Sequence, residues 1–183
     1  MVTVGALIPA GAGAETGEEF VVPDGVELPQ TMSVEEMDAI SSGGDVVITF
    51  SEDQREGSLV ARAAIPGSKC NLDPGRMWAR NSGNGLPNGG VGAKPRLHSC
   101  TPDVKRTGIA SEVWQFNGFF WFKASGPFNS YGVGNMEQKS VLHVCTGRGW
   151  YPYKVITTAW GTNSQGSTGV GRDATPERRF PCG

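Results

Sequence analysis

The chain has 183 residues, a net charge of −2 and 38% hydrophobic residues, which suits one domain with a proper core plus an appendage. Its 27 glycines and 12 prolines are typical of many short strands joined by tight turns, and not of a helical protein. Its longest apolar run, near the N-terminus, is shorter than the ~20 residues that span a bilayer, so we expect no membrane segment.

The small net charge hides an uneven distribution along the chain. Residues 1–54 contain eleven acidic residues and no lysine or arginine, whereas residues 55–183 contain seven acidic residues and all sixteen basic ones. This asymmetry predicts an acidic arm on a basic body. The bases are scattered, with only Lys105-Arg106 and Arg178-Arg179 adjacent, so they form no stripe that would follow a phosphate backbone. We therefore expect no nucleic-acid partner.

Residues 1–14 have the character of an export leader. The run from Val2 to Ala14 is apolar and uncharged, and Ala12-Gly13-Ala14 has the small-x-small form of a signal-peptidase site. No basic residue precedes the run, although a complete signal peptide has one. The pattern predicts a secreted, extracellular protein and leaves open whether cleavage follows Ala14.

Residues 15–45 predict an acidic, extended arm. Pro23 and Pro29 disfavour a helix and favour extended backbone. An extended stretch with spaced apolar residues suits a strand-like ligand that lies in a groove of another protein, although a solvated linker is the alternative. The apolar residues expected to contact the partner are Phe20, Val21, Val22, Val26 and Leu28.

One helix is predicted within this arm, over residues 33–40. Ser33 and Glu36 have the spacing of a capping box, and Met32 and Met37 have the spacing of a hydrophobic staple. Because so short a helix is unstable alone in water, we expect it to pack on another part of the protein.

Residues 46–183 predict a disulfide-bonded β-domain. Runs rich in β-branched and aromatic residues, with no alternation of helices and strands, indicate an all-β fold: an antiparallel β-sandwich of about eight short strands. The first strand candidates are Val46–Ser51, Leu59–Ile65 and Met77–Arg80, the last within a long irregular loop over residues 66–93. The later candidates are Glu112–Phe116, Phe119–Lys123, Val141–Thr146 and Tyr153–Thr162.

The clearest local pattern is an aromatic hairpin. Asn117-Gly118 predicts a two-residue type I′ turn between the strands that end at Phe116 and begin at Phe119. One face of this hairpin should belong to the core, and an aromatic second face would need another sheet or a partner to cover it. Alternation along the strands predicts Phe119 and Trp121 on the face opposite to Trp114, Phe116, Phe120 and Phe122.

The four cysteines predict two disulfides, because an exported chain folds where thiols are oxidised. Three pairings are open, and we favour Cys70–Cys100 with Cys145–Cys182, since each closes a local loop of about 30 to 40 residues. A metal is the alternative, because His98 and His143 each lie two residues before a cysteine and could complete a Cys₂His₂ set. The lack of any Cys-x-x-Cys spacing favours the disulfides, so we expect no metal and no cofactor.

No motif points to catalysis. The sequence has no Gly-x-Ser-x-Gly elbow, no His-Glu-x-x-His helix and no phosphate-binding glycine loop. We therefore expect a protein that is not an enzyme and has no catalytic residue. The residues from which a triad or a carboxylate pair would have to be built are His98, His143, Ser111, Ser164, Asp173, Glu112 and Glu137.

The order of these parts resembles that of small secreted proteins of filamentous actinobacteria, in particular the adaptor subunit of umbrella toxin particles. The resemblance rests on the arm Glu15–Gln30, the four cysteines and the C-terminal tail Arg178–Gly183. It implies an adaptor that joins a lectin-bearing subunit of inactive protease-like fold to the repeat-containing stalk of a large antibacterial toxin. The extended N-terminal segment would insert into a cleft of the lectin-bearing subunit, and no catalytic residue would be involved.

Two other functions are alternatives to an adaptor that binds other secreted proteins. Trp150 and Tyr151, expected at the surface, would suit a carbohydrate-binding module with a glycan ligand. The segment 71–99, closed by cysteines, would suit the rigid bait of a secreted protease inhibitor.

Overall fold

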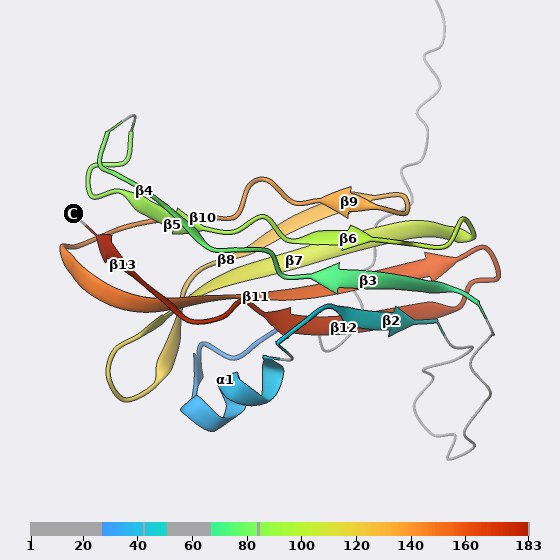
Figure 1. Ribbon diagram of the computed structural model, residues 1–183, viewed down its shortest axis with the longest axis horizontal. Coiled ribbons are helices and arrows are strands. Elements are labelled where there is room, and N and C mark those ends of the chain that lie inside the picture. Colours follow the sequence, from blue (N-terminus) through green and yellow to red (C-terminus); the bar gives the residue numbers. More distant parts are fainter. Residues whose placement is uncertain (1–26, 42, 51–66, 84, 183) are drawn as a thin grey trace, which may run out of the picture.

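A computed structural model describes residues 27–41, 43–50, 67–83 and 85–182 of the chain (Figure 1). The predicted leader, the arm before Glu27 and the strand predicted over Leu59–Ile65 lie outside these residues. The described residues form one short helix and thirteen strands with antiparallel pairing, so the predicted all-β, antiparallel β-sandwich is confirmed. The helix in the described part of the chain is not long and apolar enough to cross a membrane.

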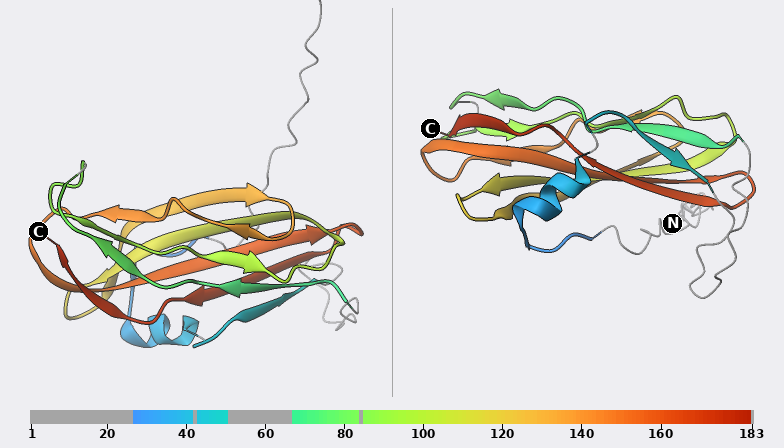
Figure 2. Two further views of the ribbon diagram at one scale, coloured as in Figure 1. Left: turned by 45° about the horizontal axis from the view of Figure 1, so that its top comes forward. Right: turned by 60° about the horizontal axis from the view of Figure 1, so that its bottom comes forward.

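The largest sheet has six strands and curls along its length (Figures 1 and 2). Its order is β1-β8-β7-β11-β12, and β13 pairs with the first part of β11. The strands of this sheet are β1 (Thr31–Met32), β7 (Val104–Phe116), β8 (Trp121–Gly132), β11 (Gly149–Asn163), β12 (Thr168–Ala174) and β13 (Arg178–Cys182).

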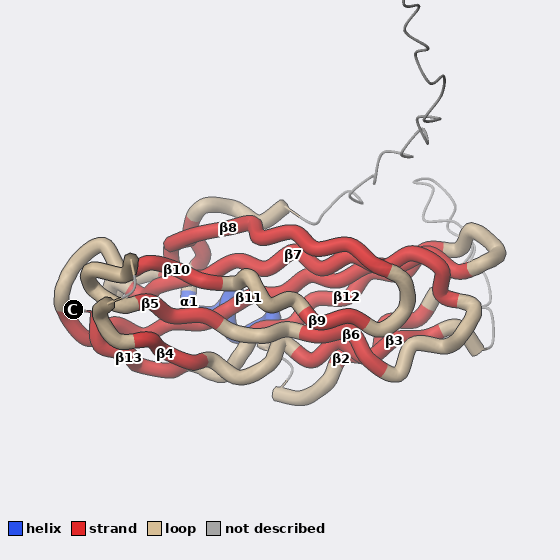
Figure 3. Tube along the Cα trace, turned by 90° about the horizontal axis from the view of Figure 1, so that it is seen from above, coloured by secondary structure: helices blue, strands red, loops and turns tan. Residues whose placement is uncertain are grey.

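Two smaller sheets cover one face of the large sheet (Figure 3). The four-stranded one has the order β2-β3-β6-β9, and the three-stranded one has the order β10-β5-β4. Their strands are β2 (Val46–Thr49), β3 (Lys69–Asp73), β4 (Trp78–Arg80), β5 (Gly90–Gly92), β6 (Arg96–His98), β9 (Met136–Glu137) and β10 (Leu142–Val144).

The two long central strands, β7 and β11, are buried on both faces. Val113 and Val155 pack in the core between the large sheet and the small ones, while their neighbours Trp114 and Ile156 pack in a second cluster on the opposite face. Successive side chains of a strand point to opposite faces, so a strand covered on both sides has buried residues without interruption.

The helix α1 (Val34–Ile40) covers this opposite face (Figure 2). The Ser33 side chain accepts a hydrogen bond from the Glu36 N–H, and the Glu36 side chain accepts one from the Ser33 N–H, which confirms the predicted capping box. Met37 is fully buried in the same cluster as Met32, Trp114 and Trp121. The helix is therefore stabilised by packing, as its short length requires.

The irregular loop predicted over residues 66–93 is wrong in part. The strand expected around Met77–Arg80 is confirmed as β4, but in the described part of the chain this segment also supplies β3 and β5 and places Val91 in the core. A Cβ on Gly92 would lie 2.1 Å from the Val141 carbonyl oxygen and 2.7 Å from the Trp78 ring. Glycine is therefore needed at this position for close packing, whereas we interpreted the glycines of this segment as a sign of a loop. The number of strands was underestimated for the same reason.

The predicted hairpin exists, but its turn and its faces differ from the prediction. Residues 117–120 form the loop, and the Asn117 side-chain oxygen accepts hydrogen bonds from the N–H groups of Phe119 and Phe120. Phe116 consequently pairs with Trp121, and residues directly opposite in an antiparallel pair share a face. Trp121 therefore lies in the core beside Trp114, while Phe119 is 87% exposed at the tip.

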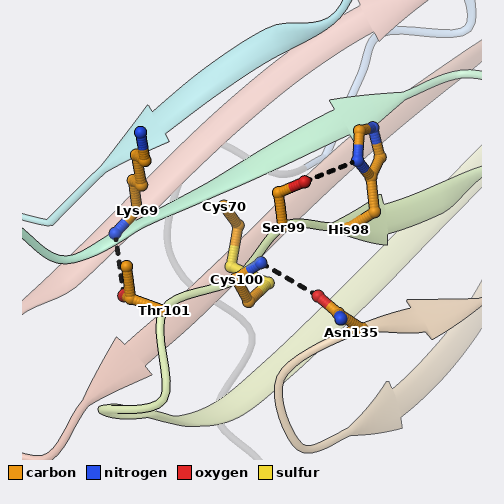
Figure 4. The surroundings of a disulfide bond; sticks show 7 residues. All are labelled: Lys69, Cys70, His98, Ser99, Cys100, Thr101 and Asn135. Carbon is orange, nitrogen blue, oxygen red and sulfur yellow. Dashed lines mark hydrogen bonds between the residues drawn. A yellow bond between two sulfur atoms is a disulfide. The ribbon is translucent and has the colours of Figure 1, made fainter.

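Both favoured disulfides are confirmed. Cys70 bonds to Cys100 between β3 and the end of β6, and Cys145 bonds to Cys182 at the end of β13 (Figure 4 shows the first). Two disulfides indicate folding in an oxidising environment, such as the extracellular space.

Candidate functional site

The described chain begins at a short segment that is fixed to the edge of the large sheet. We call residues 27–32 the arm root. Its last two residues form β1, which pairs with Trp121 and Phe122 of β8. The Lys123 N–H donates a hydrogen bond to the Gln30 carbonyl oxygen at 2.9 Å, and the Lys123 ammonium donates one to the Leu28 carbonyl oxygen at 3.1 Å. One lysine thus holds the arm root through both its main chain and its side chain.

A second lysine fixes the helix that follows the arm root. The Lys154 ammonium, on β11, donates hydrogen bonds to the Asp38 carboxylate at 3.0 Å and to the Ser41 hydroxyl at 3.2 Å. The Lys154 side chain is only 7% exposed, whereas the Asp38 side chain is 66% exposed, so a buried ammonium meets a carboxylate at the surface. An acidic residue of the predicted arm therefore docks on a basic residue of the body, as the uneven charge distribution suggests.

A pocket of about 460 Å³ adjoins the arm root. An ion pair lies at its wall, where the Lys123 ammonium is 2.7 Å from the Glu112 carboxylate and both side chains are at most 10% exposed. The Trp114 indole N–H donates to the other carboxylate oxygen at 3.2 Å. The lining residues are Glu27, Leu28, Gln30, Ala110, Glu112, Lys123, Ala124, Ser125, Gly126, Pro127 and Asn129.

The ion pair has a structural role. Burial raises the pKa of the Glu112 carboxyl, while the hydrogen bond and charge of Lys123, the Trp114 N–H and the charge of Arg172 oppose that rise. Glu112 lies opposite Ile156 in the sheet, and its carboxylate keeps the Lys123 ammonium beside the Leu28 carbonyl oxygen. The pair therefore positions the arm root.

The structure describes the predicted arm from residue 27 onward. Leu28, which we expected to contact a partner, is half-buried on the chain's own cluster around Trp114 and Trp121. The sequence pattern could not distinguish these two roles, because an apolar residue in an extended segment fits either a partner's groove or the chain's own sheet. The other four predicted contact residues, Phe20, Val21, Val22 and Val26, lie outside the described residues.

The two predicted surface aromatics have different environments. Trp150 is 69% exposed, as expected. Tyr151 is half-buried against the core between the sheets, and its hydroxyl donates to the Arg148 carbonyl oxygen at 3.2 Å. Alternation along β11 explains the difference, because these neighbours point to opposite faces.

The structure brings together one polar set that the sequence did not indicate. His98 Nε2 lies 2.8 Å from the Asp45 carboxylate, and His98 Nδ1 lies 3.1 Å from the Ser99 hydroxyl, where Ser99 has φ +53° (Figure 4 shows Ser99 and His98). The residue types are those of a catalytic triad, but the ring nitrogens are exchanged, since in a triad Nε2 contacts the serine and Nδ1 the carboxylate. The Cys100 N–H that follows Ser99 donates to the Asn135 side chain. The set connects the start of β2 to the end of β6.

The other candidates for chemistry are dispersed. The buried Ser111 hydroxyl pairs with the Thr157 hydroxyl at 3.1 Å, and Asp173 accepts a hydrogen bond from the Ala174 N–H. Ser164 lies in the turn after β11, and Glu137 lies in β9 opposite Arg96. Because Cys100 and Cys145 form disulfides, they supply no thiolate beside the histidines. Among the described residues no group of three His, Cys, Asp or Glu side chains is placed to hold a metal.

We expect His143 to make the stability of the fold depend on pH. Burial lowers the pKa of its imidazole, whose ring packs 5.9 Å from that of Tyr153. The unfolded chain therefore binds a proton more readily than the folded one, so stability is lost as the pH falls below the ordinary imidazole value of about 6.5. In urea titrations at about pH 7 and pH 5, His143→Gln should lose less stability on acidification than the natural chain. An equal loss in both proteins would contradict this role.

Comparisons of the chain with protein families, curated proteins and solved structures found no match.

Proposed function

We propose that the chain is a secreted, non-enzymatic adaptor that binds another secreted protein through the acidic segment before residue 27. The observation that carries this proposal is the anchored arm root. Lys123 holds its backbone at two points, and Lys154 holds the following helix. The acidic segment therefore joins the body at a defined place on the sheet edge.

Anchoring of this kind favours binding. A partner that binds the segment together with the neighbouring sheet edge does not have to order residues 27–41, which are already held on the body, and this reduces the entropic cost of association. The segment has acidic residues and no basic ones, together with apolar residues at Phe20, Val21, Val22 and Val26. This composition suits a groove with apolar pockets and a basic rim.

The resemblance to the umbrella toxin adaptor extends this proposal to a particular kind of assembly. On that basis the chain links subunits of an antibacterial toxin complex, and its N-terminal segment occupies a cleft of one of them. The protease-inhibitor alternative receives less support, because much of the segment 71–99 forms strands of the smaller sheets instead of a free bait loop.

Substitution of the apolar residues of the segment tests the proposal. The tagged full-length chain is exposed to the culture medium of the producing strain, and the proteins it retains are identified by mass spectrometry. Phe20→Ser with Val22→Ser should reduce capture of the main retained protein at least about tenfold, which is typical of the loss of interface anchors. Phe119→Ser with Val133→Ser is the matched control, since these residues are 87% and 71% exposed elsewhere. Equal capture by both double variants would contradict the proposal.

A further inference from the structure

One end of the molecule combines an exposed tryptophan with a group of arginines. This end contains β4, β5, β10 and β13, which lie together around the C-terminus (Figures 1 and 3). The Cys145–Cys182 disulfide joins the residue after β10 to the end of β13. Trp150, at the start of β11, is the most exposed tryptophan among the described residues, with 69% of its surface open to solvent.

Strand register defines what lies beside Trp150. Trp150 pairs directly with Pro181 of β13, and Pro152 pairs with Arg179, so these four residues share one face. Pro181 and Arg179 are both exposed. On the other face, Tyr151 pairs with Phe180 and both pack on the core. We call Trp150, Arg179 and Pro181, with Arg148 in the preceding turn, the tryptophan surface.

The tryptophan surface is held in place from beneath. Tyr151 packs its ring against Gly149, where a Cβ would lie 2.9 Å from the Tyr151 hydroxyl oxygen, and the same hydroxyl donates to the Arg148 carbonyl oxygen. The disulfide at Cys182 holds the end of β13. The backbone of this surface is therefore fixed before a ligand binds, which lowers the cost of association.

The charge at this end is strongly positive. The segments 74–92, 141–152 and 176–182 contain five arginines and a single acidic residue, Glu177. Arg76 and Arg178 line one small pocket with Met77 and Pro176, and Arg80 lies over the Trp78 ring at 4.9 Å. Guanidinium groups recognise carboxylate, sulfate and phosphate with paired hydrogen bonds.

We propose that the tryptophan surface binds an anionic glycan. The exposed indole ring provides a flat apolar platform on which a sugar ring can stack. Arg148, two residues before Trp150, and Arg179, which pairs with Pro152 on the same face, are exposed and supply guanidinium groups for its acidic substituents. A purely acidic peptide would need the arginines but not the platform, which is why the exposed tryptophan favours the glycan. This site is separate from the arm root, so the glycan-binding proposal does not depend on the proposed adaptor function.

Paired ligands test this proposal on the full chain. Dextran sulfate and dextran share one sugar backbone and differ in charge, whereas polyglutamate has the charge without the sugar. The chain should bind dextran sulfate in calorimetry more tightly than either of the others, with an affinity that falls as salt rises. Trp150→Ala should weaken binding at least about tenfold, and Arg179→Gln about threefold to tenfold.

The control variants separate this surface from charge and aromatic content in general. Lys105→Gln removes an exposed charge beside the far end of β11, and Phe119→Ala removes the most exposed aromatic ring of the described residues. Both should bind dextran sulfate like the natural chain. Three outcomes would overturn the proposal: no binding of dextran sulfate, equally tight binding of polyglutamate, or Trp150→Ala that binds as well as the natural chain while its far-ultraviolet circular dichroism is unchanged.

Discussion

Replacing Lys123 by alanine should lower the free energy of unfolding by about 3–5 kcal/mol, the range found when one partner of a buried ion pair is removed. The reason is the environment of Glu112, whose side chain is 6% exposed and whose carboxylate would lose its nearest cation. The arm root would also lose the hydrogen bond to the Leu28 carbonyl oxygen. Urea unfolding followed by tryptophan fluorescence measures the change, provided that the slope of the transition is preserved.

A double variant separates the charge from the packing. Glu112→Gln with Lys123→Met removes both charges, fills similar volumes and keeps an amide oxygen that can accept the Trp114 N–H. Its stability should lie within about 1 kcal/mol of that of the natural chain, because an uncharged, well-packed substitute for a buried pair is often neutral. A loss in the double variant as large as that in Lys123→Ala would show that packing, and not the buried charge, explains the effect.

Removing the Cys145–Cys182 bond should have the second largest effect on stability, a loss of about 4 kcal/mol for Cys145→Ala with Cys182→Ala. In the chain-entropy view a disulfide restricts the unfolded chain according to the length of the loop it closes. The sequence separations are 37 residues for this bond and 30 for Cys70–Cys100, so the two bonds should contribute almost equally. Thermal unfolding of both double variants checks this.

The two disulfide variants should also differ in their functional effect. Loss of the Cys145–Cys182 bond frees the end of β13, where Pro181 and Arg179 lie beside Trp150, whereas loss of Cys70–Cys100 affects the opposite part of the small sheets. We therefore expect weaker binding of dextran sulfate only in the first variant. A decrease in the free energy of unfolding of less than about 1 kcal/mol in either variant would contradict the entropic account of that disulfide.

Local patterns in the sequence predicted the features that depend on near neighbours. The capping box of Ser33 and Glu36 needs only a three-residue spacing, and the helix forms as expected. The disulfide pairing could be predicted because each bond joins two cysteines that close a short local loop. The sandwich followed from frequent turns and β-rich runs, since these need a second sheet to cover them.

Features that depend on distant residues could not be predicted in this way. Asp45 meets His98 across 53 positions, and Lys123 meets the Leu28 carbonyl oxygen across 95. No pattern in a single sequence indicates such pairs. Gly90 and Gly92 were interpreted as loop residues, although their lack of a side chain is what lets β4 and β10 pack on β5.

The hairpin shows how one local difference changes the expected face of several side chains. With the turn extending to Phe120, Phe116 pairs with Trp121, and the Asn117 side chain satisfies two N–H groups of the longer loop. Trp121 therefore joins the buried cluster on which Leu28 packs. The position of the arm root depends on this register, which the sequence left undetermined.

The affinity of the captured partner for a variant that lacks residues 1–26 tests the adaptor function most directly. This variant keeps the arm root, α1 and both disulfides, so its fold should be unchanged by circular dichroism. The account predicts that calorimetry with the purified partner detects binding to the full chain and none to the variant. Binding of the variant with the affinity of the full chain would place the interface on the β-domain and contradict the account.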